Sequence, residues 1–126
     1  VRDDKWQRPH QIYVAGVEGA GVIAAAATAL APSAVRQLAC DTGGFRFAQL
    51  DNPWDVNFVP GGAKYGDVPA LLALCAPIKT TVVGETRGSV AGVASAFAAA
   101  KGQVEFVGVT QAAAVDAVVN ALTGRK

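Results

Sequence analysis

The segment QIYVAGVEGAGVIAAAATALAP, residues 11–32, decides the fold that the sequence predicts. Residues 11–15 are rich in strand-forming types, and residues 22–30 form an alanine-rich helical stretch that Pro32 ends. The turn Gly16-Val17-Glu18-Gly19-Ala20-Gly21 joins the two. A strand, a glycine turn and a helix in this order are the unit from which parallel sheets are built.

The same unit recurs along the rest of the chain. Further strands are predicted at residues 34–40, 78–83 and 103–107, and further helices at 68–75, 89–102 and 111–122. Alternation with helices predicts parallel pairing through right-handed crossovers. We therefore predict a three-layer α/β fold with a mainly parallel, four-stranded sheet and flanking helices. If the strands follow one another in order, only the last helix is free to cover the second face.

Composition and charge exclude several classes of function. Of the 126 residues, 52% are hydrophobic, and 11 basic against 10 acidic residues leave a net charge of +1. Because the charges are scattered, we expect no nucleic-acid and no membrane partner. We expect an N-terminal extension at residues 1–10 and a single domain at residues 11–126. Because the chain contains no methionine, we expect it to be processed, tag-cleaved or a piece of a longer protein.

Two groups of side chains lack the spacing of a metal or redox site. Cys40 and Cys75 lie in apolar stretches without CxxC spacing, as small buried residues do. Asp51, Asp55 and Asp67 share one connection but lack the alternation of a calcium loop. We predict no metal site and no cofactor.

The glycine turn has two functional interpretations, of which the first is a cradle for a pyrophosphate. Backbone N–H groups would bind the anion, and Asp41 stands about 20 residues beyond the turn, where a ribose-binding carboxylate would lie. However, the spacing is GxxGxG rather than GxGxxG, and Glu18 puts a carboxylate where phosphate would bind. Nucleotide binding is therefore the weaker interpretation.

The second interpretation is a nucleophile elbow, in which small residues flank a side chain lifted above the sheet. Gly16-Val17-Glu18-Gly19-Ala20 has this spacing, with Glu18 in the nucleophile's place. DTGGFRF at residues 41–47, VPGGAKYGDVPALLALCAP at residues 59–77 and Gly84-Glu85 follow in order. With these motifs, residues 11–122 resemble the C-terminal half of an α/β-hydrolase of the acetyl xylan esterase and dienelactone hydrolase type.

The sequence departs from what this resemblance implies for catalysis. Glu18 replaces the serine, and residues 108–111 (GVTQ) lack the histidine expected after the fourth strand; the chain's one histidine is His10. Glu85 takes the place of the acid, which cannot carry out acyl transfer alone. We predict no catalytic residue and a non-catalytic structural or interaction module related to carbohydrate esterases. The elbow and vestigial site positions are Gly16, Glu18, Gly19, Asp41 and Glu85.

These carboxylates leave alternatives open. Glu18, Asp41 and Glu85 follow three successive strands and could frame a pocket that acts on a carbohydrate ester. Asp41 also suits a turn in which it accepts bonds from the backbone of residues 42–44. Glu85 also suits a solvated loop carboxylate or a partner for Arg87.

Two expectations concern surfaces. We expect the aromatic-rich connection at residues 41–66 to pack against the sheet, with Trp54 buried in it, rather than to form a sugar-stacking platform. The first strand has a free edge, and one helix is narrow cover for the second face. We therefore expect a homodimer through that edge or face, or contact with a neighbouring domain of a larger protein. Alternatively, residues 1–10 fold back across the edge with Trp6 as anchor.

Overall fold

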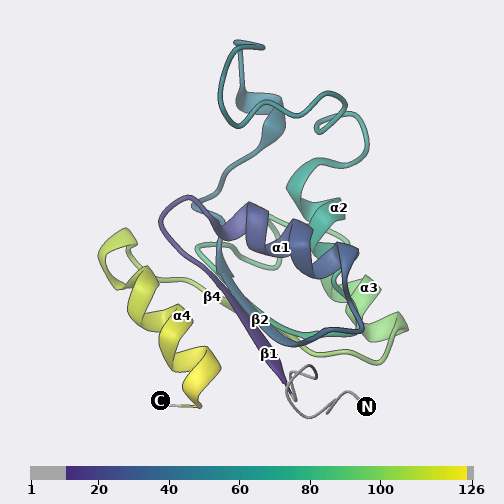
Figure 1. Ribbon diagram of the computed structural model, residues 1–126, viewed down its shortest axis with the longest axis vertical. Coiled ribbons are helices and arrows are strands. Elements are labelled where there is room, and N and C mark those ends of the chain that lie inside the picture. Colours follow the sequence, from purple (N-terminus) through teal and green to yellow (C-terminus); the bar gives the residue numbers. More distant parts are fainter. Residues whose placement is uncertain (1–10, 125–126) are drawn as a thin grey trace, which may run out of the picture.

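A computed structural model describes residues 11–124 and shows a four-stranded, all-parallel sheet between two layers of helices (Figure 1). The strands are β1 (Ile12–Gly16), β2 (Val35–Asp41), β3 (Lys79–Val83) and β4 (Val104–Val107), in that spatial order. The main helices are α1 (Gly21–Leu30), α2 (Asp67–Ala73), α3 (Val93–Ala99) and α4 (Ala114–Thr123). The predicted three-layer α/β fold is confirmed. The predicted extension at residues 1–10, with Trp6 and His10, lies outside the described residues.

The helices divide between the two faces as right-handed crossovers require. Helices α1, α2 and α3 cover one face, and α4 lies on the other against β1, β2 and β3 (Figure 1). Sequential strand order places each crossover helix on the same side. The prediction that only the last helix reaches the second face is confirmed for the described residues.

Two apolar clusters fill the two interfaces of the sheet. Alternation along β2 directs Leu38 and Cys40 toward α1–α3 and Ala39 toward α4. Burial raises the pKa of the Cys40 thiol to about 12 and that of Cys75 to about 11, so both stay protonated at neutral pH. The cysteines are the small buried residues that the sequence predicted.

The sheet face under α4 is more polar than expected. The Gln37 amide donates to the Ala121 carbonyl of α4 at 3.0 Å, and Thr81 is buried beside it. Side chains alternate between the two faces along β1. Val14 packs into the cluster under α1–α3, so Tyr13 and Ala15 point to the α4 side, where both are exposed. We expected α4 to leave a broad apolar area of this face uncovered. The uncovered apolar area is instead narrow and lies close to β1. Within residues 11–124, no helix has the length and apolarity needed to cross a membrane.

Candidate functional site

The glycine turn between β1 and α1 is tight and strained at Glu18. The Ala20 N–H donates to the Val17 carbonyl at 3.0 Å, and Glu18 has a φ of 51°. Non-glycine residues rarely adopt this left-handed conformation. Glu18 therefore lies in a strained turn directly after β1, and its side chain is exposed. Gly19 has a φ of 92°, a left-handed conformation that glycine adopts more readily than any other residue.

Two further glycines bring α1 close to the sheet. A Cβ at Gly16 would lie 2.6 Å from the Ala24 Cβ, and a Cβ at Gly21 would collide with the Asp41 carbonyl oxygen. The first helical turn therefore packs directly on the carboxyl ends of β1 and β2. This close packing accounts for the glycines at both ends of the turn without a bound phosphate.

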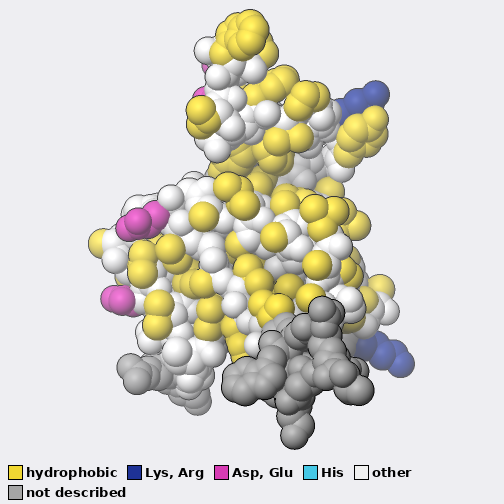
Figure 2. All heavy atoms as spheres, viewed as in Figure 1, with side chains coloured by type: hydrophobic (Ala, Val, Ile, Leu, Met, Phe, Trp, Pro, Cys, Tyr) yellow, Lys and Arg dark blue, Asp and Glu magenta, His cyan; other side chains and the backbone are white. Residues whose placement is uncertain are grey.

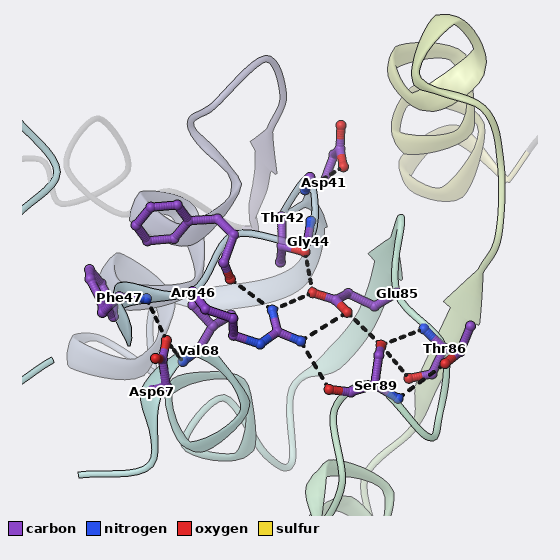
Figure 3. A network of polar contacts seen from close by, with 12 residues as sticks. Asp41, Thr42, Gly44, Arg46, Phe47, Asp67, Val68, Glu85, Thr86 and Ser89 are labelled. Carbon is purple, nitrogen blue, oxygen red and sulfur yellow. Dashed lines mark hydrogen bonds and ion pairs between the residues drawn. The ribbon is translucent and has the colours of Figure 1, made fainter. Parts of the chain in front are cut away.

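Beyond β3, the buried side chain of Glu85 is the centre of a polar network (Figure 3). Its carboxylate accepts hydrogen bonds from Thr42 Oγ1 at 2.6 Å and from Ser89 Oγ at 2.5 Å. Arg46 donates to both oxygens, through Nη1 at 2.7 Å and Nη2 at 3.1 Å. The side chain of Glu85 is only 2% exposed. Both oxygens are thus committed to partners within the chain.

The electrostatics of this network favour the charged form of Glu85. Burial opposes ionisation, but the hydrogen bonds from Arg46, Ser89 and Thr42 outweigh it and hold the Glu85 pKa below its usual range. The same hydrogen bond to Glu85 raises the pKa of Arg46. A general acid or base needs a pKa near the working pH and a free oxygen. The arrangement is that of a structural ion pair.

The alternative structural roles expected of Glu85 are wrong. Glu85 is buried rather than solvated, and its partner is Arg46 rather than Arg87, which is exposed. Gly43 and Gly44 have φ values of 59° and 71°, and the turn that they form leads the chain from β2 to Arg46. Sequence reasoning missed Arg46 because it lies 39 residues from Glu85 and no local spacing links the two.

Asp41 has the turn role expected of it. Its Oδ1 accepts the Gly43 N–H at 2.9 Å, and the Gln111 amide lies 3.5 Å from its Oδ2. Because Asp41 shares its side of β2 with Ala39, its side chain belongs to the α4 face of the sheet. The predicted frame of three carboxylates around one pocket does not form, since Glu85 is enclosed by its own partners and Glu18 points to solvent.

A second acidic residue, Asp67 at the start of α2, holds the long connection in place. Asp67 accepts hydrogen bonds from the backbone N–H groups of Phe47 at 2.8 Å, Ala48 at 2.9 Å and Val68 at 2.7 Å (Figure 3). Burial raises the Asp67 pKa, but these three bonds outweigh burial and the net shift is downward. Asp67 therefore ties the connection to α2 across 20 residues.

The rest of the connection does not pack on the sheet. The rings of Phe45 and Phe47 meet edge to face at 5.1 Å and pack against the larger cluster. Trp54, in contrast, is 89% exposed and Val56 is 97% exposed. The prediction that Trp54 is buried is wrong. Side-chain hydrogen bonds around it are local, as in the bond from the Trp54 N–H to Asn52, and none reaches the sheet.

An apolar groove of about 570 Å³ lies between this exposed part and the helices α1 and α2. Figure 2 shows the connection as a lobe standing away from the body, with hydrophobic side chains on both. The main apolar lining residues are Val22, Ile23, Val59, Tyr65, Leu71 and Leu74. Glu18, Asp41 and Glu85 do not line the groove. Its volume and apolar lining are typical of binding sites.

Comparisons with known proteins give no relative from which a function could be assigned to this groove. No family model matches the chain, and neither the curated proteins nor the solved structures include a match. Within residues 11–124, no three His, Cys, Asp or Glu side chains are grouped so that they could hold a metal ion.

Proposed function

We propose that the chain is a non-catalytic domain of α/β-hydrolase-like architecture that acts as an interaction module through the apolar groove. The observation that carries the proposal is the groove itself. Large apolar side chains line it from three segments, and Leu74 and Tyr65 are 65% and 75% exposed. Contiguous apolar surface of this kind usually marks a binding site.

The state of the acidic residues supports a non-catalytic role. Acyl transfer requires a nucleophile and a base within hydrogen-bond reach of each other. Glu18 stands in the turn where the resemblance implies a serine, and the Glu85 carboxylate is enclosed by Thr42, Arg46 and Ser89. No histidine occurs in the sequence after β4.

The order of the elements supports the relation to α/β-hydrolases. A strained turn follows β1, an acid follows β3, and a last helix follows β4. These are the positions in which the resemblance implies the nucleophile, the acid and the terminal helix. The proposal is therefore that the scaffold is kept while the reactive side chains are replaced.

Binding of an apolar dye tests the groove. The fluorescence of 1-anilinonaphthalene-8-sulfonate should rise with the unchanged protein and rise several-fold less with Leu74→Glu, which puts a charge into the groove. Val119→Glu is the matched control, because Val119 is 48% exposed on α4 and does not line the groove. Equal fluorescence with the two variants would contradict the proposed site.

Ester turnover tests the absence of catalysis. We expect no hydrolysis of p-nitrophenyl acetate above background by the unchanged protein. The Glu18→Ser variant should be equally inactive, because its new hydroxyl has no histidine near residues 108–111 to act as base. Turnover by either protein would favour the carbohydrate-esterase alternative. A rise in melting temperature with NAD or ATP would favour nucleotide binding instead.

A further inference from the structure

Strand β1 leaves one edge without a strand neighbour among the described residues. It pairs with β2 on one side, in parallel register, and lies at the end of the sheet. Its sequence, IYVAG, contains neither a charge nor a proline. Edge strands commonly carry such residues to prevent pairing with another chain. Among residues 11–124, nothing pairs with this edge of β1, so the edge can accept a further strand.

Helix α1 lies beside β1 and has an apolar outer face. Its ten residues include no charged side chain, and its one polar residue, Thr28, is buried and donates to the Ala24 carbonyl. Ala27 is exposed, and Leu30 is 87% exposed. Surface helices usually place charged or polar residues outward, and a helix that is apolar all round is usually covered.

The two features adjoin at this edge of the sheet, and we call the nearly uncharged surface that they form the β1–α1 face. It consists of the edge of strand β1, whose Tyr13 and Ala15 side chains point to the α4 side, and of Ala27 and Leu30 on α1. In residues 11–35, Glu18 is the one charged residue. In Figure 1, β1 lies between α1 and α4, and Figure 2 shows hydrophobic side chains scattered over this side of the body, with the charged ones toward its margins. This face does not include the groove-lining residues.

We propose that the β1–α1 face is the contact between two copies of this chain. A twofold axis perpendicular to the sheet pairs β1 antiparallel with β1 of the partner, so the edge N–H and C=O groups of both strands are satisfied. The same axis lays α1 along α1 of the partner, so that each apolar element meets its own copy. A net charge of +1 opposes this association only weakly.

The size of the contact predicts its strength. Five residues of β1 span about 17 Å, and ten residues of α1 span about 15 Å. A contact of these dimensions falls at the lower end of specific interfaces, which usually bury about 800 Å² per partner. The dimer should therefore dissociate reversibly on dilution.

Light scattering coupled to gel filtration tests the proposal over micromolar to near-millimolar concentrations. The unchanged protein should move from 12.8 kDa toward twice that mass as the concentration rises. Ala27→Glu should stay at the monomer mass, because two like charges would meet across the axis. Ala98→Glu is the matched control on an exposed site of α3, and it should dimerise normally. Circular dichroism establishes that each variant is folded.

A mixing experiment tests the symmetry of the contact. Ala27→Glu mixed with Ala27→Lys should recover the dimer, since opposite charges then face each other. A monomer at every concentration, a dimer of Ala27→Glu as strong as the unchanged one, or no recovery on mixing would each overturn the proposal. None of these results affects dye binding in the groove, so failure of this contact is distinguishable from failure of the proposed function.

Discussion

Two parts of the long connection both contain aromatic residues but differ in structure. In residues 42–49, Phe45 and Phe47 pack against the larger apolar cluster, whereas residues 50–65 form the exposed lobe. The first part has distant polar partners, because Arg46 binds Glu85 and the Phe47 N–H binds Asp67. In the second part, Asn52 and Asp55 bond to backbone groups two residues away. Long-range polar partners, rather than aromatic content, distinguish the packed part from the lobe.

The largest effect should come from breaking the ion pair of the packed part. Arg46→Met leaves the buried Glu85 carboxylate without its cation and should lower the free energy of unfolding by about 3–5 kcal/mol. Urea denaturation measures the change. A double variant, Arg46→Met with Glu85→Met, should be less destabilised than Arg46→Met alone, because it removes the unpaired charge.

Arg87 provides the matched control for Arg46. It follows β3 in the same loop as Glu85 but is exposed. Arg87→Met should change the free energy of unfolding by no more than about 0.5 kcal/mol. Equal effects of the two arginine substitutions would show that the Arg46–Glu85 pair does not hold the packed part.

A smaller loss is expected at the second anchor. Asp67→Ala removes the acceptor of the Phe47, Ala48 and Val68 N–H groups and should lower the free energy of unfolding by about 1.5–3 kcal/mol. Asp67→Asn should lose less, because it keeps one acceptor oxygen and tolerates the φ of 57°. Amide hydrogen exchange at Phe47 and Ala48 should accelerate in the alanine variant. Unchanged exchange there would contradict the anchoring role of Asp67.

Acid should destabilise the packed part through both carboxylates. The pKa values of Glu85 and Asp67 are lowered in the folded chain, so the unfolded chain binds more protons at low pH. The stabilisation is complete above the ordinary carboxyl range of about pH 4 and is lost as the pH falls through the folded values. Melting temperatures from neutral to acidic pH should fall less steeply for Glu85→Gln. An equally steep fall in the Glu85→Gln variant and in the unchanged protein would contradict this contribution of Glu85.

The smallest effect is expected in the lobe. Trp54→Ala should change the free energy of unfolding by about 0.5 kcal/mol or less, because the side chain is 89% exposed. Phe47→Ala, from the packed part, should lower it by about 2 kcal/mol, since the ring is partly buried against the core. Thermal denaturation compares the two. A Trp54 effect as large as that of Phe47 would show that the lobe packs in solution.

The sequence predicts the fold well because its signals are local. The glycine turn, the short apolar strands and the prolines at residues 32 and 77 mark strand and helix ends within a few residues of the observed bounds. The handedness of the crossovers then places α4 on the second face. Each of these inferences needs only neighbouring residues and a general rule of connection.

The sequence predicts the candidate site less well because its contacts are distant. The strained turn at Glu18 and the turn role of Asp41 follow from adjacent residues and are found. The partner of Glu85 and the exposure of Trp54 depend on where a long connection runs. The groove likewise joins three segments separated in the chain, so spacing along the sequence gives no sign of it.

The ionisation of Glu85 tests the central claim that the acid after β3 is structural rather than catalytic. A carbon-13 NMR titration of its side-chain carboxyl, assigned with Glu85→Gln, follows this group alone. We expect it to titrate below the ordinary glutamate value of about 4.3, because Arg46, Ser89 and Thr42 stabilise the charged form more than burial opposes it. Titration above that value, toward neutral pH, would contradict the account and mark Glu85 as a candidate general acid or base.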